Sequence, residues 1–365
     1  ILRRCHWRVV DMENPLVSFL IGCYNQEAYI REAMEGAFAQ DYSPLEIVVS
    51  DDCSTDGTFA VAQQVAREYR GPHRLVVTRT PSNRGLTGNC NHAFAQAKGE
   101  LFVLSAGDDI SVPHRTRRLV QAWNESGRQT TSLHSRLAIM DEQGKPVDEE
   151  YVDRPWWREP PVVHERATVA EFVRRRRPHV RGCTHAISRK LIELFGPLPE
   201  GVVYEDTALS FRTVLAGGTF TFVNEPLVRY RRHARNITFA LHNFRRPTRE
   251  AVREHEQKRA TELERFVRLY EGFARDAERA ASLGLISAGV LPAVRRGILR
   301  EGRRFELRRQ LLLRPWLDRV RIFCALYLTT IRPREALENA RFLLPKEIYI
   351  PVLLARERWH AARSS

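Results

Sequence analysis

The sequence predicts an α/β protein, with a mixed, mostly parallel sheet flanked by helices and a helical extension after it. Three observations support this fold class. Short apolar runs alternate with segments of helical periodicity through about residue 125, and acidic or glycine-bearing turns follow the runs. After about residue 244 the pattern is helical and rich in arginine. Strands that alternate with helices form parallel sheets through right-handed crossovers.

The first half of the chain contains the alternating elements. Apolar runs of strand length predict strands at 16–22, 45–49, 75–78 and 101–104. Apolar residues at helical spacing predict helices at 26–39, 59–69 and 89–97, with a glycine-rich loop at 82–88. Ligands of parallel sheets bind beyond the carboxyl ends of the strands, so we expect functional residues in the turns that follow these strands.

The predicted elements become mixed from about residue 114. Further helices are expected at 114–125, 168–176, 189–195 and 204–216, and further strands at 131–140, 219–224 and 227–230. The Pro- and Trp-rich stretch 151–164 predicts an ordered loop. We place a domain boundary near residue 242, so that 1–242 form the α/β domain and 243–365 a basic, mainly helical region. The apolar stripes of that region predict packing on the first domain, on a second copy of the chain, or on an anionic membrane surface.

The charge of the chain is unevenly distributed. The 365 residues include 58 Lys and Arg against 44 Asp and Glu, a net charge of +14, and the basic excess lies after residue 165. Such a region suits anionic lipid, an acidic acceptor or nucleic acid, and it is equally typical of a solvated, arginine-rich surface. No helix-turn-helix, RRM or zinc-finger pattern is present, so no nucleic-acid partner is expected.

The spacing of the cysteines and the hydropathy of the chain indicate the cellular compartment in which the protein is expected. The six cysteines are far apart and lack the spacing of metal ligands. No apolar run approaches the 18 residues that indicate a membrane-spanning helix. We therefore expect a reduced, cytoplasmic compartment, with peripheral contact to the inner face of the membrane as the alternative.

Two adjacent acids, Asp108 and Asp109, follow the predicted strand 101–104. Carboxylates so close together repel each other unless a cation lies beside them. A hard divalent ion such as Mg²⁺ or Mn²⁺ would relieve that repulsion and bridge to a diphosphate. The alternative is a solvated turn in which an Asp caps the next helix. The pair alone does not decide between these hypotheses.

The turns after the first two strands carry groups that suit a nucleoside. Asp52 follows the second strand, where a carboxylate can accept the imide N–H of a uracil or thymine ring. The Ser and Thr residues beside it equally favour a capped turn. Tyr24 lies just beyond the first strand, where its ring could stack on a base or pack at the rim.

Other candidates lie in the second half. Glu205 and Asp206 begin a predicted helix, where an acid can act as a general base or stabilise the helix N-terminus. His233 follows the last predicted strand, where it could complete a metal site or remain an exposed histidine. Trp156 and Trp157 could stack on a sugar or pack their own loop.

Taken together, these segments resemble family 2 glycosyltransferases of GT-A fold. The resemblance covers about residues 15–240 and is carried by four ordered motifs, LVSFLIGCYNQEAYIREAMEGAFAQDYSPLEIVVSDDCSTDGT, SNRGLTGNCNHAFAQAKGELFVLSAGDD, YEDTALSFR and YRRH. It implies a GT-A (Rossmann-like) fold and an inverting, metal-dependent transfer with Mn²⁺ or Mg²⁺. The implied donor is a UDP- or dTDP-sugar. The implied acceptor is a hydroxyl of a saccharide or lipid-linked acceptor, in bacterial surface polysaccharide or glycan synthesis.

The resemblance also implies roles for the matching residues. Positions that match the nucleotide-sugar site are Gly22, Tyr24, Asn25, Glu27, Asp52, Asn83, Arg84, Gly85, Asn91 and Asp108. Asp109 and His233 match the metal-binding positions, with Asp108 nearer the ribose or sugar. Asp206 matches the catalytic base, and Glu205 is its neighbour. The acceptor side is expected at Trp156, Trp157, Cys183, Thr184 and His185.

One position departs from the family pattern. Family members often have Arg before the Asn of helix 89–97, whereas this chain has Cys90 before Asn91. An arginine suggested to contact the donor is therefore missing, and Arg84 or another basic residue could replace it. Two rival hypotheses are a nucleotide-sugar-binding homologue without catalysis and a polyanion-binding protein that uses the arginine-rich half. The first three motifs retain their acids and the fourth retains His233, which favours the transferase.

Overall fold

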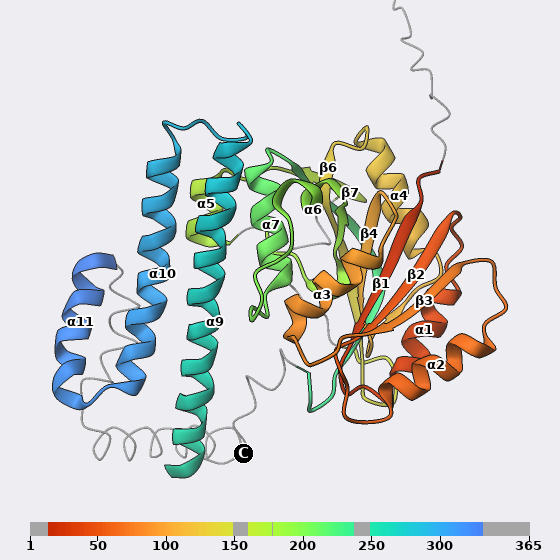
Figure 1. Cartoon of the computed structure of the whole chain (residues 1–365), viewed down its shortest axis with the longest axis horizontal. Coiled ribbons are helices and arrows are strands. Elements are labelled where there is room, and N and C mark those ends of the chain that lie inside the picture. Colours follow the sequence, from red (N-terminus) through yellow and green to blue (C-terminus); the bar gives the residue numbers. More distant parts are fainter. Residues whose placement is uncertain (1–13, 149–159, 177, 237–248, 331–365) are drawn as a thin grey trace, which may run out of the picture.

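The computed structural model describes residues 14–148, 160–176, 178–236 and 249–330 (Figure 1). Its centre is a nine-stranded sheet in the order β3-β2-β1-β4-β8-β6-β9-β5, with β7 paired to β9. The strands are β1 (Val17–Cys23), β2 (Leu45–Asp51), β3 (Arg74–Arg79), β4 (Leu101–Ala106), β5 (Ile110–Ser111), β6 (Thr130–Met140), β7 (Val162–Glu165), β8 (Ala186–Ser188) and β9 (Thr219–Arg231). The predicted mixed sheet flanked by helices is confirmed.

The first four strands form the parallel part of the sheet. In the register of β1, Cys23 lies opposite Asp51 of β2, and Gly22 lies opposite Ala106 of β4. The carboxyl ends of these strands therefore meet at one edge, as the alternation of strands and helices predicts. β8 then joins β4 in antiparallel orientation, and β6 and β9 run parallel to each other.

Helices cover both faces of the sheet (Figure 1). Successive side chains of a buried strand point to opposite faces, so Phe19 and Ile21 of β1 contact one cluster and Leu20 the other. The first face packs against α1 (Ile30–Phe38), α2 (Thr58–Glu68) and α4 (Arg115–Glu125). The second packs against α3 (Gly85–Gln96), α5 (Val169–Arg175), α6 (Lys190–Phe195) and α7 (Glu205–Leu215).

Two of the described C-terminal helices belong to the same core as the sheet, and the last one packs on its neighbour in a separate cluster. The three helices are α9 (Arg249–Ser282), α10 (Leu291–Leu313) and α11 (Trp316–Thr330), stacked outward from α7 in Figure 1. Phe273 of α9 stacks on Phe211 of α7 at 4.1 Å, and Phe305 of α10 lies in the same cluster. The packing of α9 and α10 on the first domain, one of the three alternatives predicted for this region, is therefore observed. Within the described residues, α9 and α10 pack directly on the α/β core, and the domain boundary near residue 242 stays a prediction.

Three local predictions need correction. Helix α3 begins at Gly85, within the predicted loop 82–88, and its N-cap residue Arg84 makes no side-chain capping hydrogen bond. The predicted strands 219–224 and 227–230 are one strand, whose pairing with β6 is irregular beside Pro226. Proline is tolerated at such an irregularity because it lacks a ladder donor.

The predicted loop 151–164 is partly a strand, since β7 begins at Val162 and pairs with β9. The remainder of that stretch up to residue 159 lies outside the described residues, and Trp156 and Trp157 lie there with it. Across the described part of the chain, no helix is both long and apolar enough to cross a bilayer.

Candidate active site

The candidate site lies at the carboxyl edge of the parallel strands. Backbone hydrogen bonds tie the strand ends together: the Asp52 N–H donates to the Cys23 carbonyl and the Gly107 N–H to the Gly22 carbonyl, both at 2.9 Å. Gly22 also allows close approach, because a Cβ there would lie 3.5 Å from the Asn89 amide. The turns after β1, β2 and β4 are thus held side by side.

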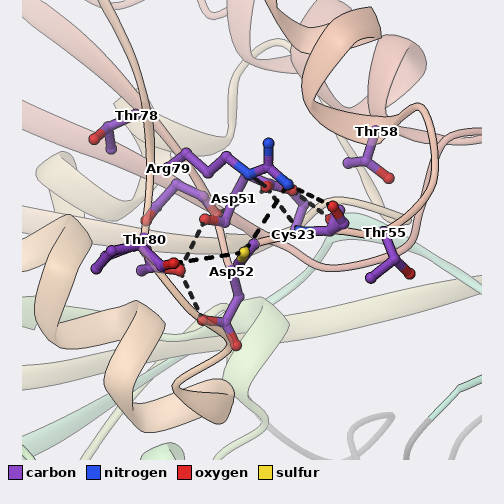
Figure 2. A network of polar contacts seen from close by, with 12 residues as sticks. Cys23, Asp51, Asp52, Thr55, Thr58, Thr78, Arg79 and Thr80 are labelled. Atoms are coloured by element: carbon purple, nitrogen blue, oxygen red, sulfur yellow. Dashed lines mark hydrogen bonds and ion pairs between the residues drawn. The ribbon is translucent and has the colours of Figure 1, made fainter.

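Asp51 and Asp52 differ in their partners, although they are adjacent. The buried Asp51 carboxylate accepts the Ser54 N–H at 2.9 Å and forms an ion pair with Arg79 at 3.2 Å. Asp52 instead accepts the hydroxyl of Thr80 at 3.1 Å on Oδ1. Figure 2 shows the Asp52 carboxyl group pointing away from the Asp51–Arg79 pair. Asp51 therefore stabilises the turn, and Asp52 is the acid outside that cluster.

The loop after β1 places Tyr24, Asn25 and Glu27 beside the turn after β2. Tyr24 is 43% exposed, so its ring is accessible. Asn25 has a left-handed backbone (φ 52°), and its Oδ1 accepts the Thr55 N–H at 2.8 Å. Glu27 accepts the Gly57 N–H, also at 2.8 Å. Asn25 and Glu27 therefore join the two turns, and Tyr24 is the member of the three available to stack on a ligand.

The loop before α3 lies next to Asp52. The Arg84 N–H donates to Asp52 Oδ1 at 2.8 Å, and the Arg84 guanidinium pairs with Glu200. Asn83 caps Gly85, whose φ of +72° favours glycine. This loop therefore fixes the Asp52 side chain, and its arginine is held by an acid from the segment before α7.

The two consecutive residues Cys90 and Asn91 of α3 have different surroundings. Both ends of the Asn91 amide bond the backbone of Leu198, at 2.9 and 2.7 Å. Asn91 thus links α3 to the segment before α7, and its amide is occupied by protein groups. At Cys90, desolvation raises the thiol pKa well above its ordinary value, and Glu205 and Asp52 raise it further. Cys90 therefore lies within the electrostatic range of both acidic clusters.

Asp108 and His233 form a pair of possible metal ligands at the site. His233 Nε2 lies 2.9 Å from Asp108 Oδ2, and Asn236 donates to the same oxygen at 3.3 Å. Asp108 comes from the turn after β4, whereas the other two follow β9, so the sheet brings together residues over 120 positions apart. Among the described residues, no group of three or more His, Cys, Asp and Glu has the arrangement of a metal site.

Asp109 points into the protein, unlike Asp108. It is 1% exposed, its Oδ1 accepts the Arg231 N–H at 2.9 Å, and its Oδ2 is buried without a hydrogen bond. Burial raises the Asp109 pKa well above its ordinary value, and Asp108 adds to that effect. The Arg231 N–H, the Cys183 thiol and the buried Arg115 act in the opposite direction. The role of Asp109 as the more direct metal ligand stays a prediction, and Asp108 is the acid that contacts His233.

A buried arginine braces this half of the site. Arg231 is 1% exposed and donates to the Asp108 carbonyl at 3.0 Å and to Glu32 at 2.9 Å. It also lies over the Tyr29 ring, which in turn packs against the His233 ring with centroids 4.8 Å apart. The sequence analysis placed Arg231 only within the YRRH motif and did not identify Tyr29, because their contact joins segments about 200 residues apart.

Glu205 and Asp206 begin α7 at the other side of the site. Desolvation, and then the neighbouring Asp206, raise the Glu205 pKa to about 8. Desolvation also raises the Asp206 pKa, while His179, Thr207 and the Gly182 N–H lower it. The pair therefore combines one acid favoured in its protonated form with one whose ionised form is supported by donors.

The acceptor-side residues lie on and after the short 3₁₀ turn η2 (Gly182–Thr184). His185 is fully buried and bonds Ser132 at 2.7 Å, and burial lowers its pKa to about 3. Thr184 is 1% exposed, with its hydroxyl on the Arg181 carbonyl at 3.1 Å. Contrary to expectation, neither side chain is exposed to an acceptor.

Comparison with known proteins agrees with this geometry. The family model "Glycosyl transferase family 2" matches residues 18–192. EpsE of Bacillus subtilis (strain 168), named as a glycosyltransferase, is 34% identical over 130 residues, which cover 36% of this chain and 46% of EpsE. An uncharacterised protein of Mycobacterium tuberculosis (strain H37Rv) is 29% identical over 287 residues, 78% of this chain and 77% of its own length.

Among solved structures, residues 1–349 of S. aureus TarS, in complex with UDP-GlcNAc, have a TM-score of 0.50 to this chain at 17% identity, covering 94% of this chain and 92% of those TarS residues. This likeness concerns the fold. The strand-edge acids, the matched family model and the named relatives agree, and residues 18–192 of this chain form a domain of glycosyltransferase family 2.

Proposed function

We propose that this protein is an inverting, metal-dependent glycosyltransferase that moves a sugar from a UDP- or dTDP-sugar to an acceptor hydroxyl. The observation that carries the proposal is the convergence of three acidic groups on one sheet edge: Asp52 after β2, Asp108 with His233, and Glu205 with Asp206. We assign Asp52 to the nucleoside of the donor, Asp108 and His233 to the metal that accompanies the diphosphate, and Asp206 to the acceptor hydroxyl.

The nucleoside end of the donor is assigned to Asp52 and Tyr24. The Arg84 N–H and the Thr80 hydroxyl both bond Asp52 Oδ1, which fixes the carboxylate and leaves Oδ2 to accept an imide N–H. Uracil and thymine present that N–H. The exposed Tyr24 ring offers a stacking surface at the same edge. The TarS complex with UDP-GlcNAc gives a precedent for a UDP-sugar on this fold.

The residues present fit a divalent ion held largely by substrate. Mg²⁺ typically uses one or two protein carboxylates together with substrate phosphates, and imidazole suits Mn²⁺ as an additional ligand. Asp108 and His233 supply one such oxygen and nitrogen. When bound, Mn²⁺ or Mg²⁺ would neutralise the charge of the departing diphosphate. Arg231 and Tyr29 hold these two ligands in place. We assign the direct metal contact to Asp108 in preference to Asp109.

The base is assigned to Asp206. Desolvation makes this carboxylate more basic, while the Gly182 and Thr207 N–H groups keep its ionised form accessible. It would take the proton from the acceptor hydroxyl as the oxygen attacks the anomeric carbon, and attack opposite the leaving diphosphate inverts that carbon. General base assistance of this kind is typically worth about 10²–10⁴-fold.

The acceptor is proposed to be a saccharide or lipid-linked hydroxyl compound of a bacterial surface glycan. The basic residues of the C-terminal helices suit contact with an anionic leaflet from the cytoplasmic side. Leu317 and Val320 of α11, 72% and 42% exposed, could support that contact or a homo-oligomer. Cosedimentation with anionic and neutral liposomes would separate the two, since only membrane contact depends on lipid charge.

The proposal is tested by thermal shift and sugar-release assays with UDP-, dTDP- and GDP-sugars, each with and without Mn²⁺. We expect stabilisation and slow donor hydrolysis with a uracil or thymine nucleotide plus metal. Stabilisation without hydrolysis or transfer to any acceptor would favour a nucleotide-sugar-binding protein. No response to any nucleotide sugar would contradict the proposal.

A further inference from the structure

The 3₁₀ turn η2 lies next to two of the acidic groups of the site, the acids of the β4 turn and the acids that begin α7. Gly182, its first residue, lies against Glu205, and its backbone N–H opposes the rise of the Asp206 pKa. Cys183, the next residue, lies beside Asp109 and contributes to the electrostatics of both Asp109 and Asp108. The turn also packs on β4, β6 and β9 of the sheet. Gly182 and Cys183, which are held against the sheet, therefore lie between the acids of the β4 turn and those of α7.

The absence of a side chain at Gly182 leaves the space that the Glu205 carboxyl group occupies. A Cβ built on Gly182 would lie 2.0 Å from Glu205 Oε1 and 3.2 Å from its Cδ, and no other group outside the turn comes within 4 Å. The backbone at Gly182 does not adopt a positive φ, so its conformational freedom is not the reason for glycine. The carboxyl group of Glu205 itself occupies the position that any other side chain would take.

We propose that Gly182 is a positioning residue, which holds the Glu205 carboxyl group against the η2 turn and so fixes the acids of α7 relative to the β4 turn. This inference rests on the proposed function of Asp206 as base. A methyl group at position 182 would push the flexible Glu205 carboxyl group aside while leaving the fold intact. The displaced carboxyl group would change the charge and the space around Asp206, its immediate neighbour.

The effect should fall on turnover and spare donor binding. The donor contacts assigned to Asp52, Tyr24 and Asp108 come from the other strand ends and do not involve Gly182. Misplacing a group at the reacting centre by about 1 Å can cost about 10²-fold in rate. We therefore expect Gly182→Ala to lower kcat about 100-fold and to change the donor KM less than twofold.

A double-mutant cycle tests the contact directly. Gly182→Ala is made in the wild type and in Glu205→Ala, where the obstructing carboxyl group is gone. The melting temperature and kcat should fall in the wild-type background, and neither should fall further in the Glu205→Ala background. Equal losses in both backgrounds, or no loss in the wild type, would overturn the proposal. The melting-temperature cycle reports on the contact even if the protein transfers no sugar, so failure of the proposed function is distinguishable.

Gly218→Ala is the matched control. Its Cβ would lie 2.1 Å from the Thr131 hydroxyl, a comparable overlap with a side-chain oxygen, and 3.1 Å from the Thr213 carbonyl oxygen of α7. Gly218 precedes Thr219, the first residue of β9, whereas the site lies beyond the last residue of that strand. We expect this variant to melt at a lower temperature with kcat unchanged. A kcat loss equal to that of Gly182→Ala would show that any overpacking slows turnover, and would refute the positioning role.

Discussion

Replacing Asp276 by alanine removes the buried carboxylate that joins α9 to α7, the helix that begins with Glu205 and Asp206. Asp276 accepts two hydrogen bonds from the Arg212 guanidinium, at 2.9 and 3.1 Å. The side chains of Arg212 and Asp276 are only 1% and 8% exposed. The same guanidinium donates to the Gly196 carbonyl at 2.7 Å, and Arg212 lies over a phenylalanine ring of α6. The variant would leave a buried cation without its counter-ion.

The magnitude follows from that burial. Removing one partner of a buried ion pair costs about 3–5 kcal/mol, because the remaining charge stays desolvated. Arg212 retains carbonyl acceptors after the change, so we expect the lower end, about 3 kcal/mol. For domains of 150–250 residues this corresponds to a fall in Tm of about 6–12 °C, and this longer chain should lie toward the smaller value.

Urea unfolding followed by far-UV circular dichroism measures the effect. The control is Glu254→Ala, which removes an exposed pair with Lys258 on the same helix and should change the free energy of unfolding far less. A second control replaces both partners, Arg212→Met with Asp276→Leu, which should recover most of the loss. A loss below about 1 kcal/mol for Asp276→Ala, or a separate unfolding transition for the C-terminal helices, would refute the view that α9 is part of the core.

Three further predictions concern the site. Asp206→Asn should lower kcat about 10²–10⁴-fold while UDP affinity stays unchanged; normal turnover would exclude Asp206 as the base. Chelator should abolish activity and Mn²⁺ restore it, and Mn²⁺ binding followed by electron paramagnetic resonance should weaken more in Asp108→Asn than in Asp109→Asn; the reverse order would return the metal contact to Asp109. Because the Glu205 pKa is raised to about 8 from an ordinary 4.5, the folded state binds the extra proton and stability falls as pH rises between these values. Wild-type Tm should therefore fall more from pH 5 to pH 8 than that of Glu205→Gln, and parallel curves would contradict the shift.

Much of the site was predictable because the sequence pattern reflects local structure. A buried strand of seven residues followed by a polar turn is visible in the chain itself, and parallel pairing then brings successive strand ends to one edge. Asp52 and Asp108 were identified on that basis, and both lie at that edge. His233 was identified through the YRRH motif, and its contact with Asp108 depends on β9 running beside the β4 turn through β5.

Other roles were not predictable because adjacent residues share a motif but not an environment. Asp108 and Asp109 are indistinguishable in the sequence, yet one faces His233 and the other faces the interior. Asn91 matches a donor-binding position, but the backbone of Leu198, over 100 residues away, occupies its amide. Which side of a turn a side chain takes depends on the strands and helices that pack beside it.

The sequence by itself determined the alternation of strands and helices and the acidic turns, since each of these depends on nearby residues of the chain. The order of the four motifs over residues 15–240 indicated the family. The tertiary structure decided which acid of each pair faces the site, why position 182 has no side chain, and that α9 and α10 complete the core. These depend on contacts between segments 20 to 200 residues apart, such as Gly182 with Glu205 and Arg231 with Glu32. Hydrophobic periodicity reports that a helix has a buried face, but only the folded chain supplies the surface that buries it.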